Sequence, residues 1–219
     1  MRWERPISNP VEFLVRQLTE TPFFADARSE FMRAVTQQFA ACRGMTALLS
    51  SCVELEDYQF NVVSRVLEDP VQRYLLADEV GLGKTVEASI IIRQYVIDSR
   101  DANVLVIAPP GLVVQWRREL SGRFGMGAHL DSSVFVVSSE DLLEVEQRAR
   151  EARMLVVDEA HHLSKVADHG GHPLYEVLRS RAVSIERLLL LSGTPVLADT
   201  TGFLRMLHLL DPVVFPLTD

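Results

Sequence analysis

The sequence predicts an α/β fold, with one parallel sheet covered by helices on both faces and a helical segment at the N-terminus. Short apolar runs alternate with helical stretches along most of the chain, which is the pattern of a parallel sheet buried between helices. The predicted strands span about 74–77, 104–108, 134–138, 154–158 and 187–191. At 219 residues, 47% of them hydrophobic, the chain can bury one sizeable core and a small helical appendage.

The N-terminal part of the chain has a different pattern from the rest. Apolar residues recur there at helical spacing, first over 11–18 and again over 31–42. Asn-Pro and Thr-Pro pairs punctuate these runs, as helix starts do. We therefore predict an accessory helical segment over residues 1–53, with its helices between about 8 and 50 packed on the core, and a main α/β domain over residues 54–219.

Composition excludes several classes of protein. No run approaches the about 18 apolar residues of a membrane span, and the first residues do not resemble a signal peptide, so we expect a cytoplasmic protein without a membrane partner. Cys42 and Cys52 have neither metal-ligand spacing nor a secreted framework, which predicts reduced thiols. The net charge of −8 means that nucleic-acid binding would need a local positive stripe. Arg117, Arg118 and Arg123 are candidates for that stripe, or else for the solvated face of a helix.

The strongest chemical signal follows the first predicted strand. Residues 77–85 read ADEVGLGKT and precede a helical pattern over 86–97. Glycines let backbone N–H groups point at an anion, and a helix N-terminus adds partial positive charge. Such a phosphate-binding loop would use Lys84 for the β- and γ-phosphates of ATP and Thr85 for Mg²⁺. The chain has only two lysines, Lys84 and Lys165, against twenty arginines, which argues against a surface turn with an incidental lysine.

An acidic pair follows the fourth predicted strand, where Met154–Val157 ends in Asp158 and Glu159. Because the carboxyl ends of parallel strands meet at one edge of a sheet, we expect this pair to face the loop at Lys84. Asp158 suits the Mg²⁺ shell, and Glu159 suits the base that orients a hydrolytic water. The alternative is an acidic helix N-cap after a buried strand. The order of the loop and the pair along the chain favours the nucleotide site.

Four segments resemble, in order, the motifs of a Swi/Snf-type superfamily-two helicase-like ATPase: LLADEVGLGKTVEA, VLVIAPPGLVVQW, LVVDEAHH and LLLSGTP. The resemblance covers about residues 54–216 and implies the first, RecA-like P-loop lobe, with ATP and Mg²⁺ as cofactors. Asp78, which replaces the first glycine of the general phosphate-loop pattern, is usual in this family. The chain is most similar to bacterial members such as the RNA-polymerase-associated remodeller, and it also resembles the Swi/Snf-type protein of 7-deazaguanine DNA-modification systems.

The resemblance implies further roles at the nucleotide site. Gln59 stands where the family has its adenine-reading motif, although without the later motifs a solvated helix residue would be the simpler interpretation. The nucleotide-binding residues implied are Gln59, Glu79, Gly81, Leu82, Gly83, Lys84 and Thr85. Thr85 and Asp158 would hold the metal, and catalysis would depend on Lys84, Asp158 and Glu159.

Two predicted strand ends match segments that lie along a DNA backbone in relatives. The residues after the second strand are Pro109, Pro110, Gly111 and Gln115. Trp116 lies on the same predicted helix, where buried packing is as good an interpretation as nucleic-acid contact. The third strand ends in Ser138 and Ser139, which either contact the backbone as the resemblance implies or cap a helix.

The last motif consists of Ser192, Gly193, Thr194 and Pro195. It matches the family segment that couples the nucleotide site to the nucleic-acid track, and a tight turn would explain its composition equally well. His161 completes an Asp-Glu-Ala-His (DEAH box) signature and is expected to bridge toward this motif. The nearby histidines 162, 169 and 172 flank a Gly-rich stretch, which predicts a flexible polar loop in preference to a metal site.

The sequence therefore predicts the ATP-binding lobe of an ATP-dependent double-stranded DNA translocase or remodeller, an ATP hydrolase in its intact form. In this superfamily a second lobe closes over the nucleotide and supplies arginine fingers, so we expect the isolated lobe to bind ATP weakly and hydrolyse it barely. The expected partners are double-stranded DNA, the second RecA-like lobe of the parent chain and other proteins of a bacterial DNA-processing or defence system. An RNA helicase lobe and a non-catalytic nucleotide-binding scaffold are the alternatives.

Overall fold

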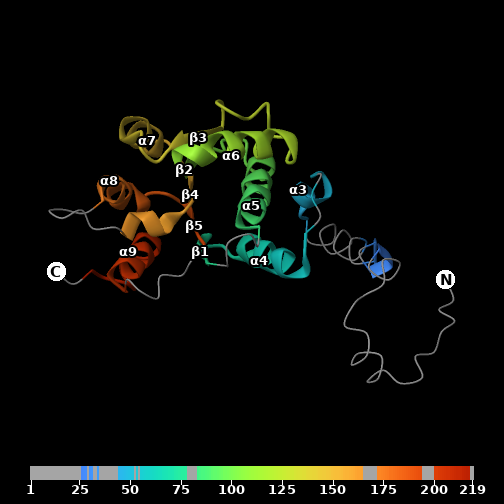
Figure 1. Cartoon of the computed structure of the whole chain (residues 1–219), viewed down its shortest axis with the longest axis horizontal. Helices are drawn as coiled ribbons and strands as arrows, with labels where there is room; N and C mark the ends of the chain where they lie inside the picture. The colour runs from blue at the N-terminus through green and yellow to red at the C-terminus, as the bar shows by residue number, and fades with distance from the viewer. Residues whose placement is uncertain are drawn as a thin grey trace, which may run out of the picture.

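A parallel sheet of five strands forms the centre of the described part of the molecule (Figure 1). The computed structural model describes residues 26–28, 30–31, 34, 44–51, 53, 55–77, 83–164, 172–193 and 200–217. The strands are β1 (Arg73–Ala77), β2 (Val104–Ala108), β3 (Val134–Ser138), β4 (Met154–Val157) and β5 (Arg187–Ser192), in the spatial order β1-β5-β4-β2-β3. Every neighbouring pair is parallel, so the predicted α/β fold is confirmed.

Helices cover both faces of this sheet. On one face are α3 (Thr46–Leu49), α4 (Asp57–Glu68), α5 (Lys84–Asp98) and α6 (Pro110–Gly122). On the other are α7 (Leu142–Ala149), the 3₁₀ helix η1 (Ala160–Ser164), α8 (Pro173–Ala182) and α9 (Thr200–Leu210). Figure 1 shows α4 and α5 on one side of the strands and α8 and α9 on the other. The molecule is thus a three-layer sandwich with two separate apolar cores.

The central strands read as continuous apolar runs because both of their faces are buried. In β2, Val104 and Val106 enter the core with α5, whereas Leu105 and Ile107 enter the core with α7 and α8. The first core also contains Ile90–Ile92, three consecutive fully buried residues of α5. A helix that is apolar on most sides in this way has to be covered by other elements, here the sheet, α3 and α4.

At the amino edge of the sheet, an arginine side chain joins the ends of two helices. Arg73, the first residue of β1, donates hydrogen bonds to the carbonyl oxygens of Leu209 and Leu210 at 2.7 and 2.6 Å, at the C-terminus of α9. It also donates to the carbonyl oxygens of Ala182 and Ile185 at 3.0 and 2.7 Å, at the end of α8. The last carbonyls of a helix have no partner within it, so one guanidinium satisfies two helix ends.

The structure describes only part of the predicted accessory segment. Within it, residues 26–28, 30–31 and 34 are helical, and α3 precedes the main domain. Met45, Ala47 and Leu48 are buried in the same core as α5, and the Ala47 N–H donates to Gln94 Oε1 at 2.9 Å. The domain boundary at residue 53 stays a prediction. Among the described residues, no helix is long and apolar enough to cross a membrane.

Candidate active site

The carboxyl edge of the sheet brings three of the predicted motifs together. β5 lies between β1 and β4, with Ala77 opposite Ser192 and Val157 opposite Leu190. Helix α5 after β1 and the turn after β4 therefore start from the same edge, one strand apart. Ser192 and Gly193, which begin the predicted coupling motif, are buried at that edge. Four predicted site residues lie outside the described residues: Glu79, Gly81, Leu82 and Thr194.

The end of the predicted phosphate loop packs against the predicted adenine-reading residue. Gly83 precedes α5 with φ 88° and ψ 24°, a left-handed conformation that favours glycine. A Cβ at this position would lie 2.1 Å from Gln59 Nε2. Gln59 is only 7% exposed, so the alternative of a solvated helix residue is wrong. Its Oε1 accepts the Glu56 N–H at 3.1 Å in a capping box, which fixes the amide beside the loop.

Lys84 and Thr85 are the first two residues of α5, which begins two residues before the predicted helix. The free N–H groups of a helix start and its dipole both favour an anion there. Asp158 follows β4 and α5 follows β1, and these two strands flank β5. The loop lysine and the first acidic residue therefore start from the same edge of the sheet.

Two hydrogen bonds hold the Asp158 carboxylate in place. Trp116 Nε1 donates to Oδ2 at 2.7 Å, and the Glu159 backbone N–H donates to Oδ1 at 2.9 Å. Burial raises the pKa of Asp158 above its usual value, while both hydrogen bonds and the charge of Lys84 oppose that rise. The carboxylate is thus withdrawn from water and stabilised by groups of the protein.

Glu159 has an unusual backbone conformation. Its φ is +50°, in the left-handed region that a residue with a side chain rarely adopts, at a cost on the order of 1 kcal/mol. Its side chain is 30% exposed, with Oε2 3.1 Å from His161 Nδ1. The rings of His161 and His162 are 4.2 Å apart. Strain of this kind accumulates at functional sites.

The two carboxylates border a cavity of about 320 Å³. Pro109 and Ser139 also line it, so the predicted nucleic-acid segments reach the same cavity as Glu159. The residues present fit a nucleotide with Mg²⁺, because a half-buried carboxylate, a hydroxyl at Thr85 and a lysine at a helix start offer the oxygen ligands and positive charge that this pair needs.

Comparisons with known proteins agree with this geometry. Residues 31–126 match the SNF2-related domain family. The chain is 36% identical over 197 residues to the RNA polymerase-associated protein RapA of Serratia proteamaculans, covering 80% of this chain and 20% of that protein. Against RapA of Vibrio parahaemolyticus the identity is 32% over 204 residues, covering 82% and 21%. The chain belongs to the SNF2-related family. It spans about a fifth of the length of these relatives.

Solved structures support the same fold for this SNF2-type lobe. The SWI2/SNF2 ATPase core of Sulfolobus solfataricus in complex with dsDNA matches with a TM-score of 0.61 and 20% identity, covering 75% of this chain and 37% of that one. The UvsW helicase of bacteriophage T4 matches with a TM-score of 0.55 and 15% identity, covering 72% and 57%. The RecA-like lobe predicted from the motifs is therefore confirmed as a fold. The likeness to the protein of 7-deazaguanine systems stays a prediction.

The predicted nucleic-acid residues of the SNF2-type lobe lie on neighbouring strand ends. Pro109 caps α6 directly after β2, and the Ser139 N–H donates to the Ala108 carbonyl at 2.8 Å, so the ends of β2 and β3 are adjacent. Gly111 and Gln115 are exposed on α6. Gln115 Nε2 donates to Glu119 Oε1 at 3.1 Å. These residues share one edge with the nucleotide site.

Ser138 and Ser139 do not cap the following helix. Asp141 is the N-cap of α7 and accepts the Glu144 N–H at 3.0 Å, while Ser138 Oγ accepts the Glu140 N–H at 3.2 Å in a local turn. The helix-cap alternative for the two serines is therefore wrong, because an aspartate three residues before Glu144 fills that role better.

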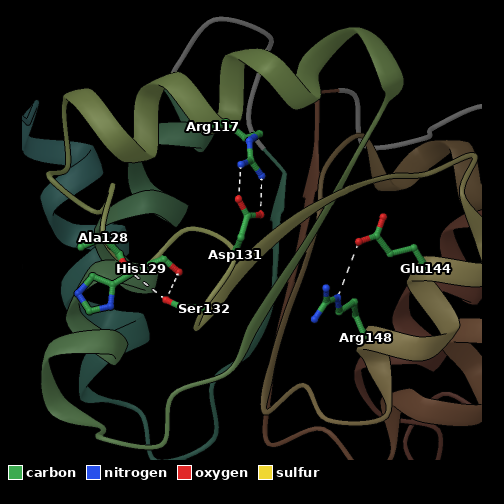
Figure 2. A network of polar contacts seen from close by, with 7 residues as sticks. All are labelled: Arg117, Ala128, His129, Asp131, Ser132, Glu144 and Arg148. Carbon is green, nitrogen blue, oxygen red and sulfur yellow. Dashed lines mark hydrogen bonds and ion pairs between the residues drawn. The ribbon is translucent and has the colours of Figure 1, made fainter.

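The proposed positive stripe on α6 is partly neutralised. Arg117 forms a two-pronged ion pair with Asp131, at 2.9 and 2.5 Å, and Figure 2 shows the two side chains pointing at one another. Arg123 lies 3.9 Å from Glu119. Arg118 is exposed. For Arg117 the alternative of a solvated helix face fits better than a phosphate contact, because its charge is already paired with Asp131.

Sequence reasoning missed the role of Trp116 at the site. The side chain is 1% exposed, which confirms buried packing and excludes the contact with nucleic acid. Its hydrogen bond to Asp158 was not predicted. A signal for it existed, because a buried indole N–H needs an acceptor and α6 starts at the edge where the acidic pair lies.

Proposed function

We propose that this SNF2-type lobe binds ATP with Mg²⁺ and hydrolyses it as part of a double-stranded DNA translocase or remodeller. The observation that carries the proposal is that Lys84, at the start of α5, and the half-buried Asp158 carboxylate follow the two strands that flank β5, so both start from one edge of the sheet. A lysine at a helix N-terminus beside a carboxylate after a neighbouring strand is the arrangement that phosphoryl-transfer sites of this kind use.

Each residue has a role in this proposal. Lys84 contacts the β- and γ-phosphates, and Thr85 and Asp158 supply oxygen ligands to the metal. When bound, Mg²⁺ neutralises charge on the phosphates. Glu159 orients the attacking water and accepts its proton, and its position beside His161 orients the carboxylate. Gln59 contacts the adenine next to Gly83.

The nucleic-acid part of the proposal depends on the carboxyl edge and on the relatives. The cavity shared by Glu159, Pro109 and Ser139 gives a short route between hydrolysis and a bound strand. The Sulfolobus SWI2/SNF2 core was solved with dsDNA, and RapA is named for its association with RNA polymerase. By this likeness the intact protein tracks double-stranded DNA in the cytoplasm, with His161, Ser192, Gly193 and Thr194 coupling the two sites.

Catalysis by the isolated lobe is proposed to be weak. Arginine fingers from a second RecA-like lobe of the parent protein would stabilise the transition state, an effect of roughly 10³–10⁵ in turnover in related phosphoryl-transfer enzymes. An ATPase assay on the 219-residue chain and on the intact protein tests this, each with no nucleic acid, with double-stranded DNA and with single-stranded RNA. We expect DNA-stimulated turnover by the intact protein alone. Robust DNA-stimulated turnover by the chain would contradict the weak-lobe proposal, and stimulation by RNA alone would favour an RNA helicase.

Glu159→Gln separates binding from hydrolysis. The amide keeps the size of the side chain but cannot accept the proton of water, so the intact protein should retain ATP binding and lose at least about 100-fold in turnover. The matched control is Glu151→Gln, an exposed glutamate before β4, which should leave turnover unchanged. A non-catalytic scaffold would give equal activity in both variants, and failure of the unmodified chain to bind ATP at all would refute the nucleotide site.

A further inference from the structure

One hydrogen bond links the helix on the nucleic-acid side to the metal-binding carboxylate. Trp116 lies in the middle of α6, and its Nε1 donates to Asp158 Oδ2 at 2.7 Å across 42 positions of sequence. The indole is 1% exposed, so its N–H has little access to water as an alternative acceptor. A hydrogen bond to an ionised group in such surroundings is among the stronger ones in a protein.

The bond acts together with a second donor on the same carboxylate. Asp158 Oδ1 accepts the Glu159 N–H at 2.9 Å, so each carboxylate oxygen has one fixed donor. Rotation about the carboxyl group would break both bonds. Because an ionised carboxylate has about four acceptor positions, a fixed orientation with two donors leaves positions for a metal or its water ligands.

Packing alone does not require a tryptophan at this position. Trp116 is buried in the same apolar core as Leu120 and Phe124, and this packing needs the ring but not its N–H group. The N–H group is what a phenylalanine would lack. Its loss would leave Asp158 half-buried with one donor fewer, which is the more costly side of a broken hydrogen bond.

We propose that Trp116 is a positioning residue, whose indole N–H orients the Asp158 carboxylate for Mg²⁺ and ties it to α6. Helix α6 begins next to Pro109 and carries Gly111 in its first turn, the segment proposed to lie along DNA. A shift of this helix on a nucleic acid would therefore move the donor of a metal ligand. The inference rests on the proposed ATP site and adds a residue that the motif roles do not include.

The first test compares nucleotide binding with and without the metal. Binding of a fluorescent ATP analogue to the chain is measured in excess Mg²⁺ and in EDTA. Trp116→Phe should reduce the affinity gained from Mg²⁺ about tenfold, as expected for one lost bond to a charged group, and should leave the affinity in EDTA within about twofold. A purely structural role would weaken both affinities together.

The control removes a similar amount of core without touching the site. Phe124 follows α6 and is fully buried in the same cluster as Trp116. Phe124→Leu should lower stability while keeping the Mg²⁺-dependent gain of the unmodified chain. If Mg²⁺ increases the nucleotide affinity of Trp116→Phe as much as that of the unmodified chain, the inference about Trp116 is overturned and the proposed function stands. If the unmodified chain does not bind nucleotide, the proposed function is refuted.

A second measurement does not require the Trp116 variant to fold. The chain has two tryptophans, Trp3 and Trp116, and hence two indole N–H signals in a ¹H–¹⁵N spectrum. Trp3→Phe assigns the signal that remains to Trp116. Asp158→Asn should shift this signal, and ATP should shift it with Mg²⁺ but not in EDTA. If the Trp116 signal shifts neither in Asp158→Asn nor on addition of ATP with Mg²⁺, the inference is overturned.

Discussion

The two edges of the sheet use partly buried polar groups in different ways. At the amino edge, Arg73 donates four hydrogen bonds to backbone carbonyls at the ends of α8 and α9. At the carboxyl edge, Asp158 accepts one bond on each oxygen, and its burial raises the pKa of the carboxyl. The first arrangement provides hydrogen-bond donors for the last carbonyl oxygens of two helices, and the second holds a carboxylate in one orientation for a ligand.

Strained backbone occurs at both edges. Glu159, at the carboxyl edge, has a φ of 50°, and Asp131, just before β3 at the amino edge, has a φ of 62°. Strained residues persist only where the surrounding structure holds them, and natural proteins retain them where function needs the geometry. We infer that Glu159 gives up some stability for the geometry of the site, whereas the strained Asp131 is paired with Arg117 and serves the fold.

Arg73→Met should give the largest loss of stability, about 3 kcal/mol, because four carbonyl oxygens lose one shared donor. Urea unfolding followed by circular dichroism measures it. The control is Arg153→Met, at the same edge but with a side chain 48% exposed and paired with Asp101 at 2.7 Å, which should cost less than about 1 kcal/mol. Equal losses of unfolding free energy in the two variants would mean that the hydrogen bonds of Arg73 to the ends of α8 and α9 add no particular stability.

Gly83→Ala should lower stability by about 2 kcal/mol and weaken ATP binding. Alanine is strained in the left-handed conformation of this residue. Its Cβ would also lie 2.1 Å from Gln59 Nε2, so the glutamine side chain would have to move away from the loop. Gly122→Ala is the matched control, since its Cβ would meet no heavy atom within 4 Å at the end of α6. Urea unfolding and nucleotide titration of both variants measure these effects. A Gly83→Ala chain that binds ATP normally would mean that the contact between Gly83 and Gln59 is not needed for ATP binding.

Glu159→Gly should raise stability by up to about 1 kcal/mol and abolish hydrolysis, because glycine adopts a φ of +50° without strain. Glu159→Gln keeps the strained side chain and should leave stability unchanged. The same unfolding assay on both variants measures the difference. If the Glu159→Gly variant is no more stable than the Glu159→Gln variant, the backbone at residue 159 is not strained.

Asp131→Asn should have the smallest effect, less than about 1 kcal/mol, because the side chains of Arg117 and Asp131 are 37% and 62% exposed and screened by solvent. Asparagine tolerates the φ of 62°, so the change removes the charge and one of the two hydrogen bonds from Arg117 without a change of backbone. Arg117 lowers the pKa of Asp131, so the pair stabilises the fold at neutral pH and the contribution is lost as pH falls through that lowered pKa. Unfolding at a series of pH values should show the two chains converging in acid; a constant difference would contradict this.

Local patterns predicted the elements well, for a physical reason. Each strand was expected within one residue of its observed bounds, since a strand buried on both faces needs a continuous apolar run such as that of β2. The position of β5 between β1 and β4 was not predicted, because strand order depends on which long-range pairs form and leaves little trace in a local window. Arg73 looked like an ordinary polar residue at a strand start, although it joins elements more than 100 positions apart.

By itself the sequence determined that a glycine loop with Lys84 and an acidic pair would follow strands of one parallel sheet, because residue type and spacing encode those features within short segments. Only the tertiary structure decided that Gln59 would pack on Gly83 and that Trp116 would hold Asp158. Contacts of that kind join residues far apart in the chain, and their partners are chosen by which side chains the packed layers bring within reach. The free energy of burying a polar group then requires that those partners be found.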